Sequence, residues 1–211
     1  MTASRLLLAD DHALFMEALV NLLNPKYDIV DVVDNGRALQ ESFRKHRPDA
    51  IVTDITMPLM NGLEAIRQLQ KEGNSPRVVF LTMHHDIDLV RECFRCGGSA
   101  FVTKERSCDE LIIAIEAVLK NHTYVSPGFP ASVSDVSAAA NSTAPRMDPL
   151  TSRQREILQL FAEGKTMKTI ATIMNLSTRT VEWHKYRMMQ VLNVQNSAEL
   201  VRYALRTKLV A

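Results

Sequence analysis

Short apolar runs alternate with amphipathic stretches along the first 120 residues of the chain. The apolar runs are rich in Val, Ile and Leu and too short for helices, and they occupy residues 6–9, 29–33, 50–52, 78–81 and 100–102. The amphipathic stretches between them lie near residues 13–23, 36–45, 62–72, 86–96 and 107–120. This alternation predicts right-handed βαβ units, and hence an α/β fold with a doubly wound, five-stranded parallel sheet.

The pattern changes at residue 126. Residues 126–149 are rich in Ser, Ala and Pro and have no periodicity, which is typical of a flexible linker. Helical periodicity then returns near residues 152–163, 167–174, 178–192 and 197–208. Thr151 and Gln154 fit a capping box, Ser177 is a candidate N-cap, and Gly164 is a stop signal. We therefore predict an α/β domain over residues 1–122, a linker over 123–148 and an all-α domain of four helices over 149–211.

Charge divides the chain in the same way. Residues 1–122 carry 14 Lys and Arg against 18 Asp and Glu, whereas residues 145–211 carry 11 against 5. The basic C-terminal part favours a polyanionic partner. No apolar run approaches the roughly 20 residues of a membrane span, and the N-terminus has no signal-peptide pattern. Three closely spaced cysteines argue against a disulfide framework, so we expect a cytoplasmic protein without a membrane partner.

Acidic residues fall where the predicted strands end. Asp10 and Asp11 follow the first strand and Asp54 follows the third, while Thr82 and Lys104 follow the fourth and fifth. The ends of parallel strands lie side by side, so these carboxylates converge and favour a hard cation such as Mg²⁺. A carboxylate nucleophile, a metal ion and a lysine are the groups that phosphoryl transfer to an aspartate requires.

Residues 5–104 resemble the receiver domain of bacterial response regulators, which has a flavodoxin-like fold. The matching segments are LLLADDH (6–12), PDAIVTDITMPLMNG (48–62), VVFLTMH (78–84) and Lys104. The resemblance implies that Asp54 is the phosphoacceptor. It also implies that Asp11, Asp54 and the carbonyl of Thr56 bind Mg²⁺, with Asp10 acting through water. The remaining implied roles are phosphoryl binding by Thr82 and Lys104, and a rotating switch aromatic at Phe101.

Residues 150–210 resemble the LuxR-type (NarL/FixJ) helix-turn-helix domain through LTSRQREIL, STRTVEWH and ELVRYA. Helical spacing places Val181, Met188 and Leu192 on one inward face of the third helix. The residues that we expect to contact DNA are Lys165, Lys168, Arg179, Thr180, Glu182, Trp183, Lys185, Tyr186 and Arg187. By resemblance the last helix makes a dimer through Leu200, Val201, Ala204 and Leu205; the alternative is that this stripe packs onto its own domain.

The CFRC segment, with Cys93 and Cys96, leaves two interpretations open. His84, His85 and Cys108 are close enough in sequence to join a metal or redox site. The pair lies inside a predicted helix, however, and not at the helix N-terminus that stabilises a thiolate. Structural thiols are therefore the favoured interpretation.

Together these features predict a two-component response regulator and not an enzyme. A partner histidine kinase would phosphorylate Asp54 with Mg²⁺, and this would promote homodimer binding to double-stranded DNA, with RNA polymerase as a candidate further partner. A phosphatase is the first rival, but Asp54-Ile55-Thr56 lacks a second acid two residues on. A receiver that acts without phosphorylation is the second rival, and the intact acidic site argues against it.

Overall fold

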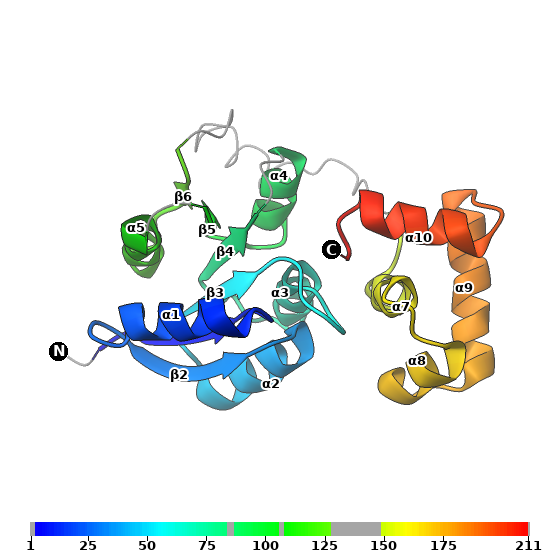
Figure 1. Cartoon of the computed structure of the whole chain (residues 1–211), viewed down its shortest axis with the longest axis horizontal. Helices are drawn as coiled ribbons and strands as arrows, with labels where there is room; N and C mark the ends of the chain where they lie inside the picture. Colours follow the sequence, from blue (N-terminus) through cyan, green and yellow to red (C-terminus); the bar gives the residue numbers. More distant parts are fainter. Residues whose placement is uncertain (1–2, 84–86, 106–107, 128–148, 211) are drawn as a thin grey trace.

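The computed structural model describes residues 3–210 apart from 84–86, 106–107 and 128–148. The N-terminal domain contains one parallel sheet in the order β2-β1-β3-β4-β5-β6 (Figure 1). Its strands are β1 (Arg5–Ala9), β2 (Asp28–Val33), β3 (Ala50–Asp54), β4 (Val78–Thr82), β5 (Ala100–Thr103) and β6 (Tyr124–Val125). The first five match the predicted strands, and the doubly wound α/β fold is confirmed.

The sixth strand corrects the prediction of a five-stranded sheet. Tyr124 and Val125 were expected to begin the linker, but they pair in parallel with Ala100 and Phe101 of β5. Two residues are too few to produce a recognisable apolar run, and only the neighbouring edge of β5 gives them a partner. Residues 128–148, which make up most of the predicted linker, lie outside the described residues.

Helices cover both faces of the sheet because the central strands β1, β3, β4 and β5 are buried on both sides. In β1, Leu7 packs with one layer, whereas Leu6 and Leu8 pack with the other. The helices of the first layer are α2 (Gly36–His46), α3 (Gly62–Lys71) and α4 (Ile87–Arg95). Those of the second layer are α1 (Ala13–Leu23) and α5 (Cys108–Leu119). The two layers leave the strand ends open, and the acidic residues lie there.

The C-terminal domain contains α7 (Ser152–Ala162), α8 (Met167–Met174), α9 (Thr178–Leu192) and α10 (Ser197–Arg206), as predicted. The capping box of Thr151 and Gln154 is present, and the Ser177 side chain accepts from the Thr180 N–H at the start of α9. Val181 and Met188 are fully buried in the core that the four helices share. No helix in the described part of the chain combines the length and the apolar character needed to cross a membrane.

Candidate functional site

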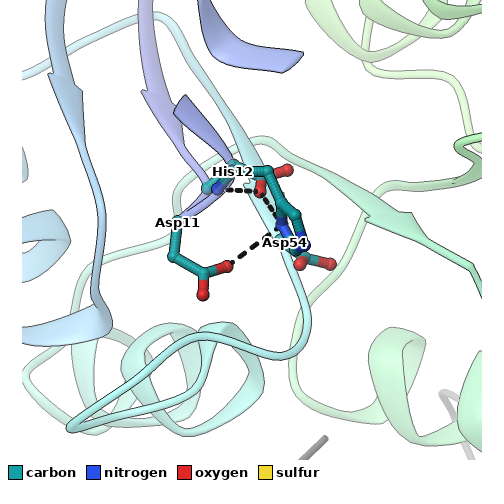
Figure 2. A group of neighbouring side chains, drawn as sticks. Asp11, His12 and Asp54 are labelled. Carbon is teal, nitrogen blue, oxygen red and sulfur yellow. Dashed lines mark hydrogen bonds and ion pairs between the residues drawn. The ribbon is translucent and has the colours of Figure 1, made fainter. Parts of the chain in front are cut away.

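Two aspartates meet at the ends of adjacent strands. Asp10 follows β1 and Asp54 is the last residue of β3, and these strands pair in parallel. Both side chains are buried, whereas that of Asp11 is partly exposed. Figure 2 shows Asp11, His12 and Asp54 gathered in one group, and the candidate ligand atoms of Asp10, Asp11, His12 and Asp54 all lie within 4.8 Å of one another. The predicted convergence of the acids is therefore present.

Lys104 supplies a positive charge to this group. It follows β5, and its Nζ lies 2.7 Å from Asp10 Oδ2 and 2.9 Å from Asp54 Oδ2. Burial raises the pKa of the Asp54 carboxyl, and the neighbouring Lys104 ammonium offsets only part of this rise. Burial acts to lower the pKa of Lys104, but its bonds to Asp10 and Asp54 outweigh burial and raise that pKa above its ordinary value.

The residues present fit a magnesium ion. The cluster contains three carboxylates, and the one ammonium group beside it pairs with Asp10 and Asp54 only, so an excess of negative charge remains. Its candidate ligands are mostly the hard oxygen atoms that Mg²⁺ prefers. Asp10, Asp11 and Asp54 are in position to hold it, and the main chain of Thr56 lies two residues beyond Asp54. When bound, Mg²⁺ would supply positive charge to balance these acids and an incoming phosphoryl group.

His12 also belongs to the cluster, although no sequence pattern indicated it. Its Nδ1 lies 2.9 Å from Asp10 Oδ1 and 3.2 Å from Asp11 Oδ1, and its backbone N–H donates to Asp10 Oδ1 at 3.0 Å. His12 holds the two acids beside α1, where it occupies the N-cap position. The available signal was its position directly after Asp11.

Thr82 and Phe101 lie where the sequence places them. Thr82 ends β4 with only 1% of its surface exposed, and its carbonyl accepts from the Lys104 N–H at 2.8 Å. Phe101 is fully buried in β5, opposite Phe80 of β4. Phosphoryl binding by Thr82 and rotation of Phe101 stay predictions.

Cys93 and Cys96 are both buried in α4 and the turn that follows it. Burial raises the pKa of the Cys93 thiol well above its ordinary value and that of Cys96 to about 12. Metal binding and thiol exchange both require a thiolate, so these groups favour the structural interpretation. His84, His85 and the side chain of Cys108 lie outside the described residues.

A candidate DNA interface covers one side of α9. Trp183 is 57% exposed and Tyr186 is 71% exposed, although both are large side chains. The other exposed residues of the predicted set are Lys168, Arg179, Glu182 and Arg187, and the half-buried ones are Lys165, Thr180 and Lys185. The Thr180 hydroxyl lies 2.8 Å from that of Ser177, so it belongs to the helix cap, and Lys185 Nζ lies 4.9 Å from the centre of the Phe161 ring.

The stripe on α10 does not form one free surface. Leu200 and Ala204 are fully buried in the core of the C-terminal domain, whereas Val201 is half-buried and Leu205 is 48% exposed. Helical spacing shows that four side chains share a face, but it does not show which surface covers them. The dimer prediction is therefore wrong for Leu200 and Ala204 as contact residues, and it stays a prediction for Val201 and Leu205.

Comparison with known proteins identifies the families of the two domains. The sequence model of the response regulator receiver domain matches residues 6–116, and that of the luxR family of bacterial regulatory proteins matches residues 148–204. The chain is 32% identical to the oxygen regulatory protein NreC of Staphylococcus carnosus, over 98% of this chain and 99% of that protein. It is also 32% identical to the transcriptional regulatory protein MctR of Rhizobium johnstonii, over 95% and 92% of the two chains.

Solved structures of regulators share the fold. The response regulator RcsB of Salmonella typhimurium superimposes with a TM-score of 0.62 at 24% identity, over 96% of this chain and 97% of that one. A LuxR-family two-component response regulator from Aurantimonas sp. SI85-9A1 is 29% identical with a TM-score of 0.57, over 66% and 96% of the two chains. With a receiver domain and a luxR-family domain matched in one sequence, this chain belongs to the two-component response regulators with a LuxR-type DNA-binding domain.

Proposed function

We propose that this response regulator binds DNA through α9 and that Mg²⁺-dependent phosphorylation of Asp54 by a histidine kinase controls this binding. The observation that carries the proposal is the Lys104 ammonium, 2.9 Å from the buried carboxylate of Asp54. An oxygen of this carboxylate would attack the phosphorus of a phosphohistidine, so that an O–P bond forms as the P–N bond breaks. Lys104 and Thr82 would then hold the phosphoryl oxygens.

The loop that leaves the phosphorylation site contacts the DNA-binding domain directly. Residues 55–61 connect Asp54 to α3, and α7 lies against them. Gln159 of α7 donates from Nε2 to the Met57 carbonyl at 2.7 Å and accepts the Asn61 N–H at 2.9 Å. Because these bonds join α7 to the backbone of the loop, movement of the loop on phosphorylation would change the contact between the domains.

Leu59 links the backbone conformation of the loop to the end of α7. Its φ is +65°, a left-handed conformation that costs about 1–2 kcal/mol for a residue with a side chain. The Leu59 N–H donates to Glu163 Oε1 at 3.1 Å, so the end of α7 holds the loop in this conformation. Loss of that bond would favour a relaxed loop.

Ion pairs also join the two domains at this contact. Arg155 Nε of α7 lies 2.6 Å from Glu64 Oε2 of α3, and both side chains are only 2% exposed. Burial acts to raise the pKa of Glu64, but the guanidinium groups of Arg155 and Arg67 hold it below its ordinary value. On α2, Arg37 pairs with Glu156 at 3.0 Å. The contact is thus polar, which suits an interface that opens and closes.

The receiver domain does not cover the recognition helix. Figure 1 shows α9 at the far edge of the molecule, with α7 between it and the receiver domain. The C-terminal end of α10 lies nearer the receiver, where Asn61 Nδ2 donates to the Leu209 carbonyl at 3.4 Å. Phosphorylation would therefore act by freeing the end of α10, so that two chains form a homodimer. The dimer would place its two α9 helices on adjacent DNA half-sites. This binding would take place in the cytoplasm. RcsB, which shares this fold, has been solved as two dimers bound to two parallel DNAs.

The proposed function is tested by the DNA affinity of the phosphorylated chain. A duplex is selected from a random pool, and its binding is measured with and without prior treatment with phosphoramidate and Mg²⁺. Allosteric coupling usually changes affinity by roughly 5- to 150-fold, and we expect an increase in this range. Asp54→Asn treated in the same way should show no increase. Equal affinity of the treated and untreated native chains would instead support a receiver that acts without phosphorylation.

Gln159→Glu should open the interface without phosphorylation. In the native chain, Gln159 Nε2 donates to the Met57 carbonyl and, at 2.9 Å, to Glu163 Oε1. The variant keeps the shape of the side chain but places a carboxylate oxygen against both of these acceptors. An unsatisfied buried polar group costs about 1–3 kcal/mol, and separation of the domains removes this cost. We expect a larger radius of gyration in small-angle X-ray scattering.

Gln195→Glu is the matched control, because Gln195 is exposed between α9 and α10. This variant should scatter like the native chain. If Gln159→Glu also keeps the native radius, the contact of Gln159 with the loop does not hold the domains together.

A further inference from the structure

A cleft of about 740 Å³ lies between the two domains, and its lining includes neither the acidic residues of the phosphorylation site nor Lys104. Residues of α3 and α4 form most of its receiver side, and Arg155 of α7 and the end of α10 with the residues that follow it form the other. This volume falls within the range of about 300–1,000 Å³ that is common for small-molecule sites. Neither the receiver chemistry nor the recognition helix uses this cleft.

The cleft carries more positive than negative charge. Six of its lining side chains are Lys or Arg, and only two are acidic, Asp88 and Glu92. Glu64 adds one further negative charge because it pairs with both Arg67 and Arg155. An excess of three positive charges remains, and it comes from both domains.

The cations on the two sides have different environments. On α4, Arg91 pairs with Asp88 at 3.0 Å, and Arg95 lies 3.9 Å from Glu92, which also pairs with Arg67. Arg206 of α10 is exposed, and its guanidinium carbon lies 5.6 Å from the centre of the Tyr203 ring. Like charges that line one cleft repel each other, so an anion that bridges them would lower the energy of the closed arrangement. Several arginines together favour phosphate oxygens, which accept paired N–H donors.

Most of the remaining wall of the cleft is apolar or aromatic, although Asn61 and Thr207 also line it. Leu63 and Leu89 of the receiver domain are buried there, and Tyr203 and Leu209 are half-buried on the other side. Small-molecule sites commonly combine such a wall with a few charged groups. A flat aromatic group of the ligand would pack against this wall while its phosphates meet the arginines.

We infer that this cleft binds a nucleoside polyphosphate, with the phosphates on Arg95 and Arg206 and the base beside Tyr203. Because the ligand contacts both domains, it stabilises the closed arrangement and opposes opening at the α7 contact. The chain would thus respond to a diffusible anion as well as to phosphorylation. The inference does not depend on phosphorylation of Asp54.

Isothermal titration calorimetry of the full, unphosphorylated chain tests this inference. ADP, pyrophosphate and adenosine are titrated separately at low ionic strength in buffer freed of divalent ions, so that no metal carries phosphate to the acidic site. We expect ADP to bind at one site per chain, pyrophosphate to bind more weakly, and adenosine to give no heat. No binding of ADP would overturn the inference, and equal binding of ADP and pyrophosphate would overturn the role of the aromatic wall.

Single variants locate the site. Arg95→Ala on the receiver and Arg206→Ala on α10 should each weaken ADP binding by roughly tenfold or more, because each removes a charge-assisted bond to phosphate. Both side chains lie at the surface, so both variants should fold.

Arg179→Ala is the control, because this exposed arginine lies on the predicted DNA face of α9, where an anion could bind instead. It should bind ADP like the native chain. Loss of binding in Arg179→Ala, with native affinity in the other two variants, would move the anion to the DNA face and overturn the cleft assignment.

Discussion

Asp54→Asn should remain wholly unmodified under conditions in which the native chain gains the mass of one phosphoryl group. Treatment with phosphoramidate and Mg²⁺ followed by intact mass spectrometry measures this directly. The amide keeps the size of the side chain but removes the nucleophilic oxygen that lies beside Lys104. Removal of Mg²⁺ by chelation should also abolish labelling of the native chain. Without the metal ion, Lys104 balances only part of the negative charge of the three aspartates.

A thermal melt of Asp54→Asn would check that the variant is folded. Burial raises the pKa of Asp54, so the folded protein binds this proton more tightly than the unfolded chain does. The stabilising effect of the bound proton is fully present below the unfolded pKa near 3.8 and is lost as the pH rises through the folded pKa. At neutral pH the variant should therefore melt at a higher temperature than the native chain, and the difference should shrink in acid. Labelling of Asp54→Asn at the native rate would show that another residue is the phosphoacceptor.

Trp183→Ala should weaken binding to a selected DNA duplex by about 1–3 kcal/mol and flatten the preference for that sequence. The ring is 57% exposed on α9 although it is large and apolar, and the Arg187 guanidinium carbon lies 6.0 Å from its centre. A side chain so exposed contributes little to the core, so its loss should leave the fold intact. Competition between specific and random duplexes at fixed salt measures both effects.

Lys168→Ala provides the contrast, because Lys168 is exposed near the N-terminus of α8 and is expected to meet phosphate. Lys168→Ala should weaken binding to all DNA sequences alike. It should also reduce the slope of the logarithm of the binding constant against the logarithm of the salt concentration by about one. If Trp183→Ala keeps the native affinity and specificity, Trp183 does not contact the DNA bases. The base contacts would then have to be sought at Arg179 and Lys185.

The sequence alone determined the two domains, nine of the helices in the described residues and the first five strands, because periodicity and caps are local properties. It also placed Asp10, Asp54 and Lys104 together, since parallel strands bring successive strand ends to one edge of a sheet. Thr151 and Gln154 predicted their capping box because both partners lie within one turn of helix.

Only the tertiary structure decided the remaining features. His12 has no periodic signal, and its two acidic partners became evident only from their distances. Gln159 lies about 100 residues from the Met57 carbonyl that it contacts, and a polar residue on a helix is expected at the surface. Leu200 and Ala204 were placed correctly on an apolar face, but only packing shows that their own domain covers it. The hydrophobic periodicity of a helix or strand indicates which of its faces is buried. The surface that covers this face depends on how distant parts of the chain pack.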